Sequence, residues 1–345
     1  MARRIGFGII GIGIIGKTHA LAINNNDNCS LVSAYHPDMG KVRAFSDKYG
    51  CKRAYDDLES FLSDPELEVV AIATPSGAHL DPALAAINHG KHVLIEKPLE
   101  ISPQRCRMII DAAREKGVLV GGIFQSRFYD ASRLVKKAVE EGRFGRLTLV
   151  DAQVKWFRSQ DYYDSGAWRG TWAMDGGGVL MNQGIHAIDL LQWLTGKVSE
   201  VQAYTATLSH ERIEVEDNSV AALRFENGAL GVIEGSTSLS RNTENLKRLE
   251  LCGTDGTVVL EENMIKVWSF NDERPEDEMI RRDYQKGFEP FVPKLLGHER
   301  QFQDMADAII NGREPEVTGE AASESVKIVC SIYESVRERR PVKVD

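Results

Sequence analysis

A glycine-rich segment near the N-terminus is the first feature of this sequence that can do chemistry. Gly11, Gly13 and Gly16 have the spacing G-x-G-x-x-G, directly after an apolar run and before a helical stretch. The first glycine permits a tight turn, the second lets the backbone approach a diphosphate, and the third lets the helix pack on the strand. The helix start, with Ile14 and Ile15, offers unpaired N–H groups to the same anion. The segment predicts a dinucleotide-binding turn, with a ligand-free glycine turn as the alternative.

The end of the next apolar run bears on which dinucleotide is bound. An acidic residue there, roughly 20 residues after the glycines, hydrogen-bonds the ribose 2′-hydroxyl of NAD. This chain has His36 at that place and Asp38 after Pro37, while Lys41 and Arg43 could meet the 2′-phosphate of NADP. Asp38 could equally cap the following helix. We expect NAD as the cofactor and keep NADP as the alternative.

Lys97 is the candidate for a proton-transferring group. It follows the expected strand 92–95 and precedes Pro98, which fixes the backbone. The carboxyl end of a parallel strand is the edge at which ligands bind in doubly wound sheets. Oxidation of an alcohol needs a base for the hydroxyl proton, and a partly buried lysine beside a cationic nicotinamide ring has a lowered pKa. A solvated lysine paired with Glu96 is the alternative.

A second group of polar residues follows the glycine triplet 176–178. Asn182, His186 and Asp189 recur at helical spacing, and the glycines permit a close backbone approach. This pattern predicts a site on one helix face. A single histidine on an apolar helix, here 185–194, can equally be a satisfied core residue.

Aromatic and arginine side chains are concentrated between residues 156 and 172. Arg158, Tyr163, Trp168 and Arg169 belong to this segment. Aromatic faces suit sugar rings, and arginine forks suit carboxylate or phosphate groups. The same residue types also line sheet cores and interfaces. We expect a sugar-like substrate, and the arginines favour an acidic sugar or a nucleotide sugar.

Taken together, these motifs resemble the glucose-fructose oxidoreductase, inositol dehydrogenase and MocA-like (Gfo/Idh/MocA) family. The resemblance rests on Ala-Thr-Pro-Ser at 73–76 with His79, the run 91–99 containing Glu-Lys-Pro, Trp-Arg-Gly at 168–170, and the glycine triplet with Gly-Ile-His at 184–186. It implies an N-terminal Rossmann domain and a C-terminal open antiparallel sheet that makes oligomer contacts. It also implies that Lys97 is the base and that His186 transfers a proton or orients the substrate.

The chain departs from the family pattern at one position. The family usually has an aspartate four residues before the histidine, and this chain has Asn182. An amide can orient a hydroxyl but cannot take its proton, so acid and base work would fall on Lys97 and His186.

The remaining site expectations complete this picture. Further cofactor contacts are expected from Thr74, Pro75, His79, Glu96, Lys97, Gln125, Trp168 and Arg169. Substrate contacts are expected from Lys97, Arg158, Tyr163, Asn182, His186 and Arg241. The catalytic set is Lys97, His186 and Asn182, and no metal ligand is expected because no histidine or cysteine spacing suits one.

The elements that must position these residues change character along the chain. Short β-branched runs alternate with helical stretches in the first third, which predicts βαβ units around a parallel sheet. Longer alternating runs dominate afterwards, with hairpin signals at 226–228 and 254–256, and predict a mainly antiparallel sheet. We therefore expect residues 1–124 to form an NAD(P)-binding domain and 125–345 an α+β domain for substrate and oligomer contacts. The charged, breaker-rich segment 271–283 is expected to be an exposed loop.

Composition limits the possible partners. The 345 residues are 42% hydrophobic and 27% charged, which is typical of globular proteins and suits two domains. A net charge of −9 without a basic run disfavours nucleic acid, and no run suits a membrane span. Arg3 and Arg4 precede an apolar run as in a signal peptide, but the glycines make a poor hydrophobic helix. Five cysteines without paired spacing fit the cytoplasm.

The leading hypothesis is an NAD(P)-dependent oxidoreductase. Hydride would pass between nicotinamide C4 and a ring hydroxyl or ketone of a sugar, cyclitol or nucleotide-sugar acid. Two alternatives stay open: an NAD-retaining glycosidase that works by transient oxidation, and a non-catalytic nucleotide-binding regulator. A homo-oligomer, dimer or tetramer, through the C-terminal sheet is expected.

Overall fold

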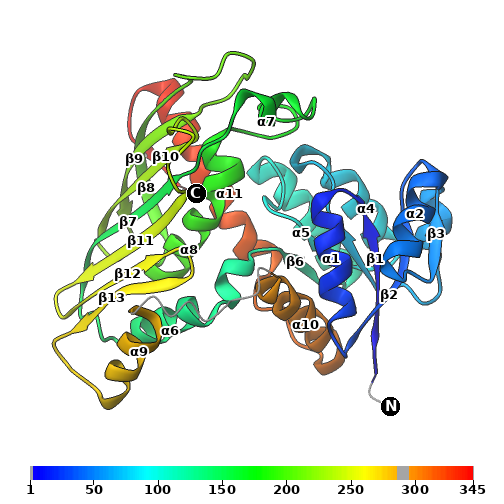
Figure 1. Ribbon diagram of the computed structural model, residues 1–345, viewed down its shortest axis with the longest axis horizontal. Coiled ribbons are helices and arrows are strands. Elements are labelled where there is room, and N and C mark those ends of the chain that lie inside the picture. The colour runs from blue at the N-terminus through cyan, green and yellow to red at the C-terminus, as the bar shows by residue number, and fades with distance from the viewer. Residues whose placement is uncertain (1–2, 286–294, 345) are drawn as a thin grey trace. The chain divides into compact units, whose positions relative to one another are not determined.

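The computed structural model describes residues 3–285 and 295–344, which fall into two compact units (Figure 1). Unit 1 comprises Met1–Gln125 with Pro293–Ser323, and unit 2 comprises Ser126–Val292 with Glu324–Asp345. The predicted fold class, a parallel sheet followed by a larger, mostly antiparallel one, is confirmed. Our division at residues 124 and 125 stays a prediction, because it concerns what each part binds.

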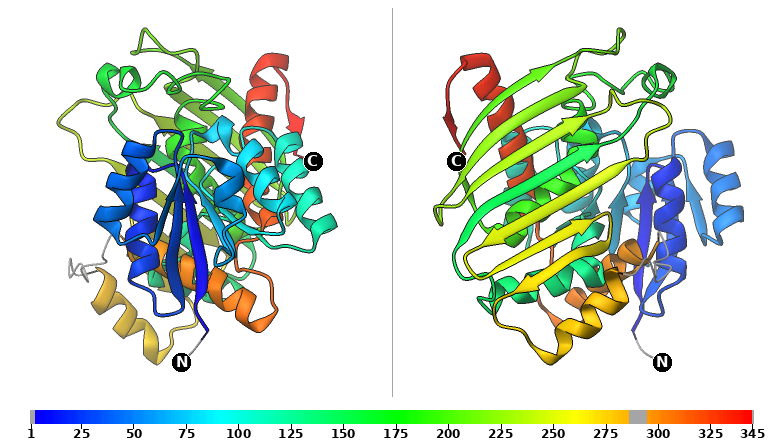
Figure 2. Two further views of the ribbon diagram at one scale, coloured as in Figure 1. Left: turned by 90° about the vertical axis from the view of Figure 1, so that its right-hand side faces the viewer. Right: turned by 60° about the vertical axis from the view of Figure 1, so that its left-hand side comes forward.

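Unit 1 is built on six parallel strands in the order β3-β2-β1-β4-β5-β6, with helices on both sides of the sheet (Figure 2). Every residue of the central strand β1 is buried, as expected for a strand covered on both faces. In the core between this sheet and α1 and α10, the rings of Phe7 and Phe302 lie 5.4 Å apart. The strands are β1 (Ile5–Ile10), β2 (Cys29–Tyr35), β3 (Arg53–Tyr55), β4 (Val69–Ile72), β5 (His92–Ile95) and β6 (Val120–Gly122). The helices are α1 (Ile14–Asn24), α2 (Met39–Tyr49), α3 (Leu58–Leu62), α4 (Leu80–Asn88), α5 (Pro103–Lys116) and α10 (Leu296–Asn311), with a 3₁₀ turn η1 (Ser76–Ala78).

Unit 2 contains eight strands in the order β13-β12-β11-β7-β10-β9-β8-β14. Among the strands described in this sheet, only β7 and β10 pair in parallel. Both predicted hairpins, β9–β10 and β11–β12, are present. The strands are β7 (Leu147–Lys155), β8 (Val198–Ala206), β9 (Asn218–Phe225), β10 (Leu230–Ser236), β11 (Leu246–Gly253), β12 (Gly256–Glu261), β13 (Met264–Phe270) and β14 (Val342–Lys343). The helical segments are α6 (Asp130–Glu140), α7 (Gln160–Asp164), η3 (Leu180–Gly184), α8 (Ile185–Thr195) and α9 (Pro275–Gln285). Two further segments, η2 (Gln125–Phe128) and α11 (Gly319–Glu338), begin in unit 1 and continue in unit 2.

The two faces of the unit 2 sheet differ in burial. Along β9 the residues Ser219, Ala221, Leu223 and Phe225 are buried, and the residues between them are exposed. Helix α8 packs against β7 and β11 on the buried side. In the right-hand view of Figure 2 the strands of the other face are seen uncovered. The large apolar side chains exposed on strands of this sheet are Leu149, Tyr204, Val220, Leu230 and Val267.

One predicted loop is wrong, because 275–285 forms helix α9. Pro275 occupies its first turn, and Glu276, Asp277 and Glu278 follow there, where acidic side chains stabilise a helix start. Asp277 is buried and accepts two hydrogen bonds from Arg143, at 2.7 and 2.6 Å. The charged residues that indicated a loop are thus helix-start residues and an ion-pair partner. No helix within the described ranges is long and apolar enough to cross a bilayer.

A buried carboxyl group holds the start of the helical segment η3–α8. Glu216 accepts hydrogen bonds from the backbone N–H groups of Gly178 and Leu180, at 2.9 and 3.0 Å, and from the Tyr333 hydroxyl at 2.9 Å. A Cβ on Gly178 would lie 1.7 Å from the Glu216 carbonyl oxygen, so only glycine permits this approach. Burial raises the pKa of Glu216 to about 7 against these three hydrogen bonds.

A buried ion pair holds the other side of α8. Arg127 donates two hydrogen bonds to Asp189, at 2.7 and 2.6 Å, and its guanidinium lies 5.5 Å from the Trp193 ring centre. Asp189 is fully buried. Its position in the core differs from our expectation that it shares a helix face with Asn182 and His186.

We expect Asp189→Asn to lower the free energy of unfolding by about 3–5 kcal/mol, because Arg127 would stay buried without its counter-ion. Urea denaturation measures this change. Asp111→Asn is the matched control, since Asp111 pairs with Arg114 on the surface, and it should leave stability essentially unchanged. Equal midpoints for the two variants would contradict the assignment.

Glu216 should make stability depend on pH. Its carboxyl ionises near pH 4.5 in the unfolded chain and near 7 in the folded one, so the unfolded state releases its proton first as the pH rises. The contribution of Glu216 to the free energy of unfolding is fully present below pH 4.5. About 3 kcal/mol of it is lost as the pH rises through 7. Glu216→Gln removes this loss, so the urea stability of the wild type should fall by about 2–3 kcal/mol relative to that of the variant between pH 5 and pH 8. Parallel profiles would overturn the prediction.

Candidate cofactor and substrate sites

The glycine turn in unit 1 has the geometry of a diphosphate cradle. Gly11 has φ +95°, and a Cβ there would lie 2.5 Å from the Ala73 backbone. A Cβ on Gly16 would lie 2.0 Å from the Gly11 carbonyl oxygen, whereas a Cβ on Gly13 would meet nothing within 4 Å. The turn is therefore closed at its first and third glycines and open at its second. This is the arrangement that an approaching diphosphate requires.

The helix after this turn starts without a side-chain cap. Helix α1 begins at Ile14, and no side chain bonds its first N–H groups at the Gly13 cap. Ile14 is 76% exposed and Ile15 is 38% exposed. Uncapped N–H groups at an open helix start suit an anion, so these residues fit the predicted dinucleotide.

The end of β2 carries the residues expected near the ribose. The Asp38 carboxylate accepts the Lys41 N–H at 3.1 Å and thereby caps α2. The His36 Nδ1 accepts the Asp38 N–H at 2.9 Å. The capping role that the sequence left open is thus present. A ribose contact by either residue stays a prediction.

Lys97 is the one partly exposed residue in a buried stretch. All the remaining residues from Val93 to Glu100 are buried. The preceding carboxylate, Glu96, accepts the Lys97 backbone N–H at 3.0 Å and the His19 Nε2–H at 2.9 Å, and the His298 Nε2 lies 3.9 Å away. Burial alone would raise the pKa of Glu96, but the His19 bond and the nearby positive charges hold it at about 2. A buried, ionised carboxylate is therefore bonded to the backbone of Lys97.

His79 connects the strand ends of β4 and β5. Its Nδ1 lies 3.0 Å from the Pro98 carbonyl oxygen and its Nε2 lies 3.0 Å from the Thr74 carbonyl oxygen. Burial lowers the pKa of this histidine, so the neutral ring donates to one carbonyl at a time. Thr74 and Pro75 are partly exposed beside it. His79 is 1% exposed, so the structure places it behind the strand ends, and its cofactor contact stays a prediction.

In unit 2, Asn182 and His186 are the two partly exposed residues of 181–190, and the rest of that stretch is buried. Asn182 lies in the π-helical turn η3, which leads into α8. Such turns are frequent at functional sites. The structure therefore presents both predicted residues from one rigid, otherwise buried helical segment.

The Asn182 side chain is tied to an acid that sequence reasoning missed. Its Nδ2 donates to the Asp175 Oδ1 at 2.7 Å, and the Asp175 Oδ2 accepts the Gly170 N–H at 2.9 Å. Asp175 is 2% exposed. Its place directly before the glycine triplet is the signal that could have drawn attention to it.

Arginine and aromatic side chains alternate in the segment predicted to meet the substrate. We call Trp156, Arg158, Tyr162, Arg169 and Trp168, in that order, the stacking ladder. The Arg158 guanidinium lies 5.4 and 5.0 Å from the Trp156 and Tyr162 ring centres. That of Arg169 lies 4.4 Å from both the Tyr162 and Trp168 ring centres. The ladder presents two cations on aromatic surfaces.

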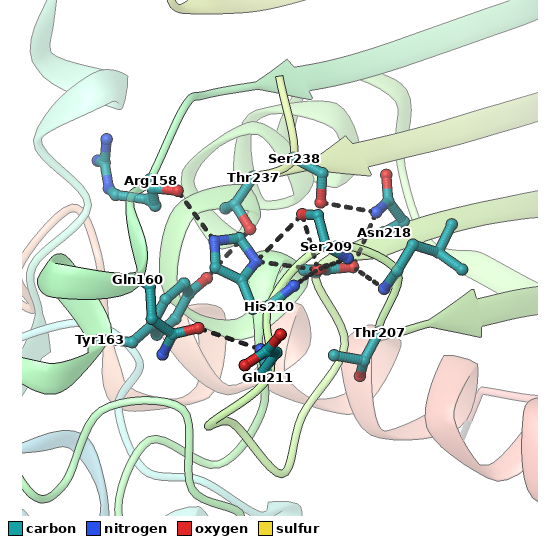
Figure 3. Close-up of polar contacts among 12 residues, drawn as sticks. Arg158, Gln160, Tyr163, Thr207, Ser209, His210, Glu211, Asn218, Thr237 and Ser238 are labelled. Atoms are coloured by element: carbon teal, nitrogen blue, oxygen red, sulfur yellow. Dashed lines mark hydrogen bonds and ion pairs between the residues drawn. The ribbon is translucent and has the colours of Figure 1, made fainter. Parts of the chain in front are cut away.

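Two contacts attach this ladder to the rest of unit 2. Gln183, next to Asn182, donates to the Tyr162 hydroxyl at 3.3 Å. The His210 Nε2 donates to the Arg158 carbonyl oxygen at 2.9 Å (Figure 3). The His210 Nδ1 lies 2.9 Å from Asp217. Burial alone would raise the pKa of Asp217, but the backbone N–H groups of Leu208 and Ser209, with the His210 and Asn218 side chains, hold it well below the usual range. The backbone at Arg158 is thereby fixed.

Other predicted residues occupy different surroundings. Tyr163 is 4% exposed and its hydroxyl bonds the Thr237 hydroxyl at 3.0 Å, whereas the neighbouring Tyr162 is partly exposed. Arg241 lies in an exposed turn after β10, and Gln125 is partly exposed with a buried Oε1 that no described residue bonds. Substrate contact by Tyr163 and Arg241, and cofactor contact by Gln125, Trp168 and Arg169, stay predictions.

Comparison with known proteins bears on these two sites. Residues 5–124 match the model of an oxidoreductase family with an NAD-binding Rossmann fold, and residues 132–259 match the GFO/IDH/MocA C-terminal domain. The WlbA dehydrogenase of Bordetella pertussis, solved with NADH and UDP-GlcNAcA, is 34% identical, with a TM-score of 0.93 over 100% of this chain and 99% of that one.

Curated relatives act on sugars and cyclitols. The myo-inositol 2-dehydrogenase of Thermotoga maritima is 25% identical over 98% of both chains. The levoglucosan dehydrogenase of Pseudarthrobacter phenanthrenivorans is 28% identical over 74% of this chain and 73% of its own. Both domain models match, and the WlbA dehydrogenase of Bordetella pertussis is 34% identical over 99% of its length, so the chain belongs to the Gfo/Idh/MocA oxidoreductase family.

Proposed function

We propose that this chain transfers a hydride between NAD and a ring hydroxyl or ketone of a sugar-derived substrate. The observation that carries the proposal is the exposure pattern of its polar residues. Lys97 emerges alone from the buried stretch 93–100, and Asn182 and His186 emerge from the buried stretch 181–190. Polar groups exposed singly from rigid, buried segments are typical of pre-organised catalytic residues.

The chain's own residues divide the work. The glycine turn and the uncapped start of α1 hold the dinucleotide diphosphate, and bound NAD supplies the hydride acceptor at nicotinamide C4. The Lys97 Nζ takes the hydroxyl proton, while Glu96 fixes the backbone on which Lys97 stands. His186 and Asn182 bind and orient the sugar. Because an amide takes no proton, proton transfer rests on Lys97 and His186.

We further propose a nucleotide-linked sugar acid as the substrate. The WlbA dehydrogenase of Bordetella pertussis binds UDP-GlcNAcA together with NADH. In this chain Arg158 and Arg169 of the stacking ladder offer two cations to a carboxylate or diphosphate. A neutral sugar or inositol would leave these cations without an anion.

The cofactor is proposed to be NAD rather than NADP. The Asp38 side chain is 52% exposed beside His36, and its negative charge disfavours a 2′-phosphate. The buried, unbonded Oε1 of Gln125 supports a hydrogen-bond donor on the cofactor at that place. The cytoplasm is the proposed location, since all five cysteines are thiols.

A homo-oligomer through the open face of the unit 2 sheet is the proposed assembly. Tyr204 is 80% exposed and Val220 is 56% exposed, and the two residues are register partners on β8 and β9, so their side chains form an adjacent exposed pair. A second copy is proposed to cover them.

We expect Lys97→Ala to lower kcat by roughly 10²–10⁴, the size of a general-base contribution. NADH binding, followed by fluorescence, should persist. Lys116→Ala, at the exposed end of α5, is the matched control and should keep full turnover. An unaffected kcat in Lys97→Ala would remove Lys97 from the mechanism.

A substrate screen tests the activity itself. We expect NADH to bind more tightly than NADPH in fluorescence titrations, and nicotinamide absorbance at 340 nm to change with nucleotide-sugar acids rather than with free sugars or inositols. The reason is that the proposed ribose site at Asp38 would repel the extra phosphate of NADPH. Preferred turnover of a neutral polyol would contradict the substrate class, and no turnover on any compound would contradict the dehydrogenase proposal.

Introducing a charge on the open sheet face tests the assembly. Val220→Glu should lower the mass measured by light scattering to that of a monomer, because a buried unpaired carboxylate is costly. The exposed Met108 of α5, changed to Glu, is the control. A monomeric wild type would exclude the proposed interface.

A further inference from the structure

The pair formed by Asp175 and Asn182 fixes which way the Asn182 amide faces. An ionised carboxylate only accepts hydrogen bonds. Both Asp175 oxygens face N–H donors, the Gly170 backbone at 2.9 Å and the Asn182 Nδ2 at 2.7 Å. The amide must therefore turn its NH₂ group towards Asp175. Its carbonyl oxygen is turned away from that carboxylate.

The burial of Asp175 and Asn182 indicates which side of the Asn182 amide faces the core. Asp175 is 2% exposed, and Asn182 is partly exposed beside His186. The acid therefore lies behind the amide, on the side of the core. Free rotation of the amide would exchange an acceptor for a donor on the accessible side, and the buried carboxylate opposes that rotation.

We propose that Asp175 is a positioning residue that makes Asn182 an acceptor towards the substrate. The group recognised there is then a donor, a sugar hydroxyl or an amide N–H, and not a carboxylate or a ketone oxygen. This inference rests on the proposed function, in which Asn182 binds the sugar. Asp175 acts only through Asn182 and through the backbone of Gly170.

Exchanging the two side-chain types separates this proposal from simple packing. In Asp175→Asn, the new oxygen must accept the Gly170 N–H, so the new NH₂ faces Asn182 and turns its amide round. In Asn182→Asp, two carboxylates stand about 2.7 Å apart, and one of them must hold a proton. In the double variant D175N/N182D, the amide at 175 bonds both Gly170 and the carboxylate at 182, so both of these hydrogen bonds return.

The first experiment measures thermal unfolding of the wild type, both single variants and the double variant at pH 6 and pH 8. We expect Asn182→Asp to lower the midpoint by about 3–6 °C more at pH 8 than at pH 6, because both carboxyls then tend to ionise. The double variant should return to within a degree or two of the wild type. Asp111→Asn is the charge-matched control. A pH-independent loss in Asn182→Asp, or a double variant as unstable as the sum of the singles, would overturn the pair.

The second experiment measures kcat and KM with the substrate that the wild type turns over best. We expect Asp175→Asn to raise KM roughly 10- to 100-fold with unchanged NADH affinity, since a donor then faces a donor. D175N/N182D should recover most of kcat/KM, because the acceptor is restored. An unchanged KM in Asp175→Asn, or a stable double variant that stays impaired, would sink the positioning role. A wild type without turnover would contradict the proposed function instead, and the unfolding experiment would still decide the pair.

Discussion

An ionised carboxylate is costly to bury unless hydrogen-bond donors surround it. In both units of this protein, buried acids accept hydrogen bonds from backbone N–H groups and thereby hold the backbone in place. Glu96 accepts the N–H of Lys97, and Asp175 accepts that of Gly170. Glu216 accepts those of Gly178 and Leu180, although its pKa of about 7 leaves it partly protonated at neutral pH. Asp217 does the same for residues 208–210. All four acids are buried. Lys97 belongs to the backbone that Glu96 holds, and Asn182 follows the segment that Glu216 holds. Moving one of these segments would leave a buried carboxyl group with fewer hydrogen-bond donors.

This arrangement explains why so few side chains are exposed where chemistry is proposed. Because hydrogen bonds on the buried side hold the backbone, exposed side chains are not needed to stabilise it. Lys97, Asn182 and His186 are therefore partly exposed residues among buried neighbours. Residues fixed in this way need little reorganisation when a substrate arrives. Two histidines contact these buried acids: His19 donates to Glu96, and His210 contacts Asp217.

The sequence alone predicted the local features well. The glycine turn, the parallel and antiparallel sheets and the hairpins at 226–228 and 254–256 follow from short-range patterns, and all are present. Helix α9 was missed because its acidic first turn has the composition of a loop.

The roles of these buried acids could not be predicted from the sequence. Their hydrogen-bond partners either lie far away in the chain or follow no regular sequence spacing. Glu216 bonds Leu180 across 36 positions, and Arg127 bonds Asp189 across 62. Tyr162 and Tyr163 are adjacent in a helix of five residues, too short for periodicity to show that Tyr163 is the buried one. Asp175 is only seven positions from Asn182, but nothing in the residue types says that the two side chains meet.

The stacking ladder has a thermodynamic consequence. A free arginine side chain gives up about 2 kcal/mol of rotamer entropy when it is immobilised. Arg158 and Arg169 are already held against aromatic rings, and Arg169 also donates to the Tyr162 hydroxyl at 2.7 Å. Much of that entropy is lost during folding, before any ligand arrives. An anion that meets the two guanidinium groups therefore binds cations whose ordering was completed when the chain folded.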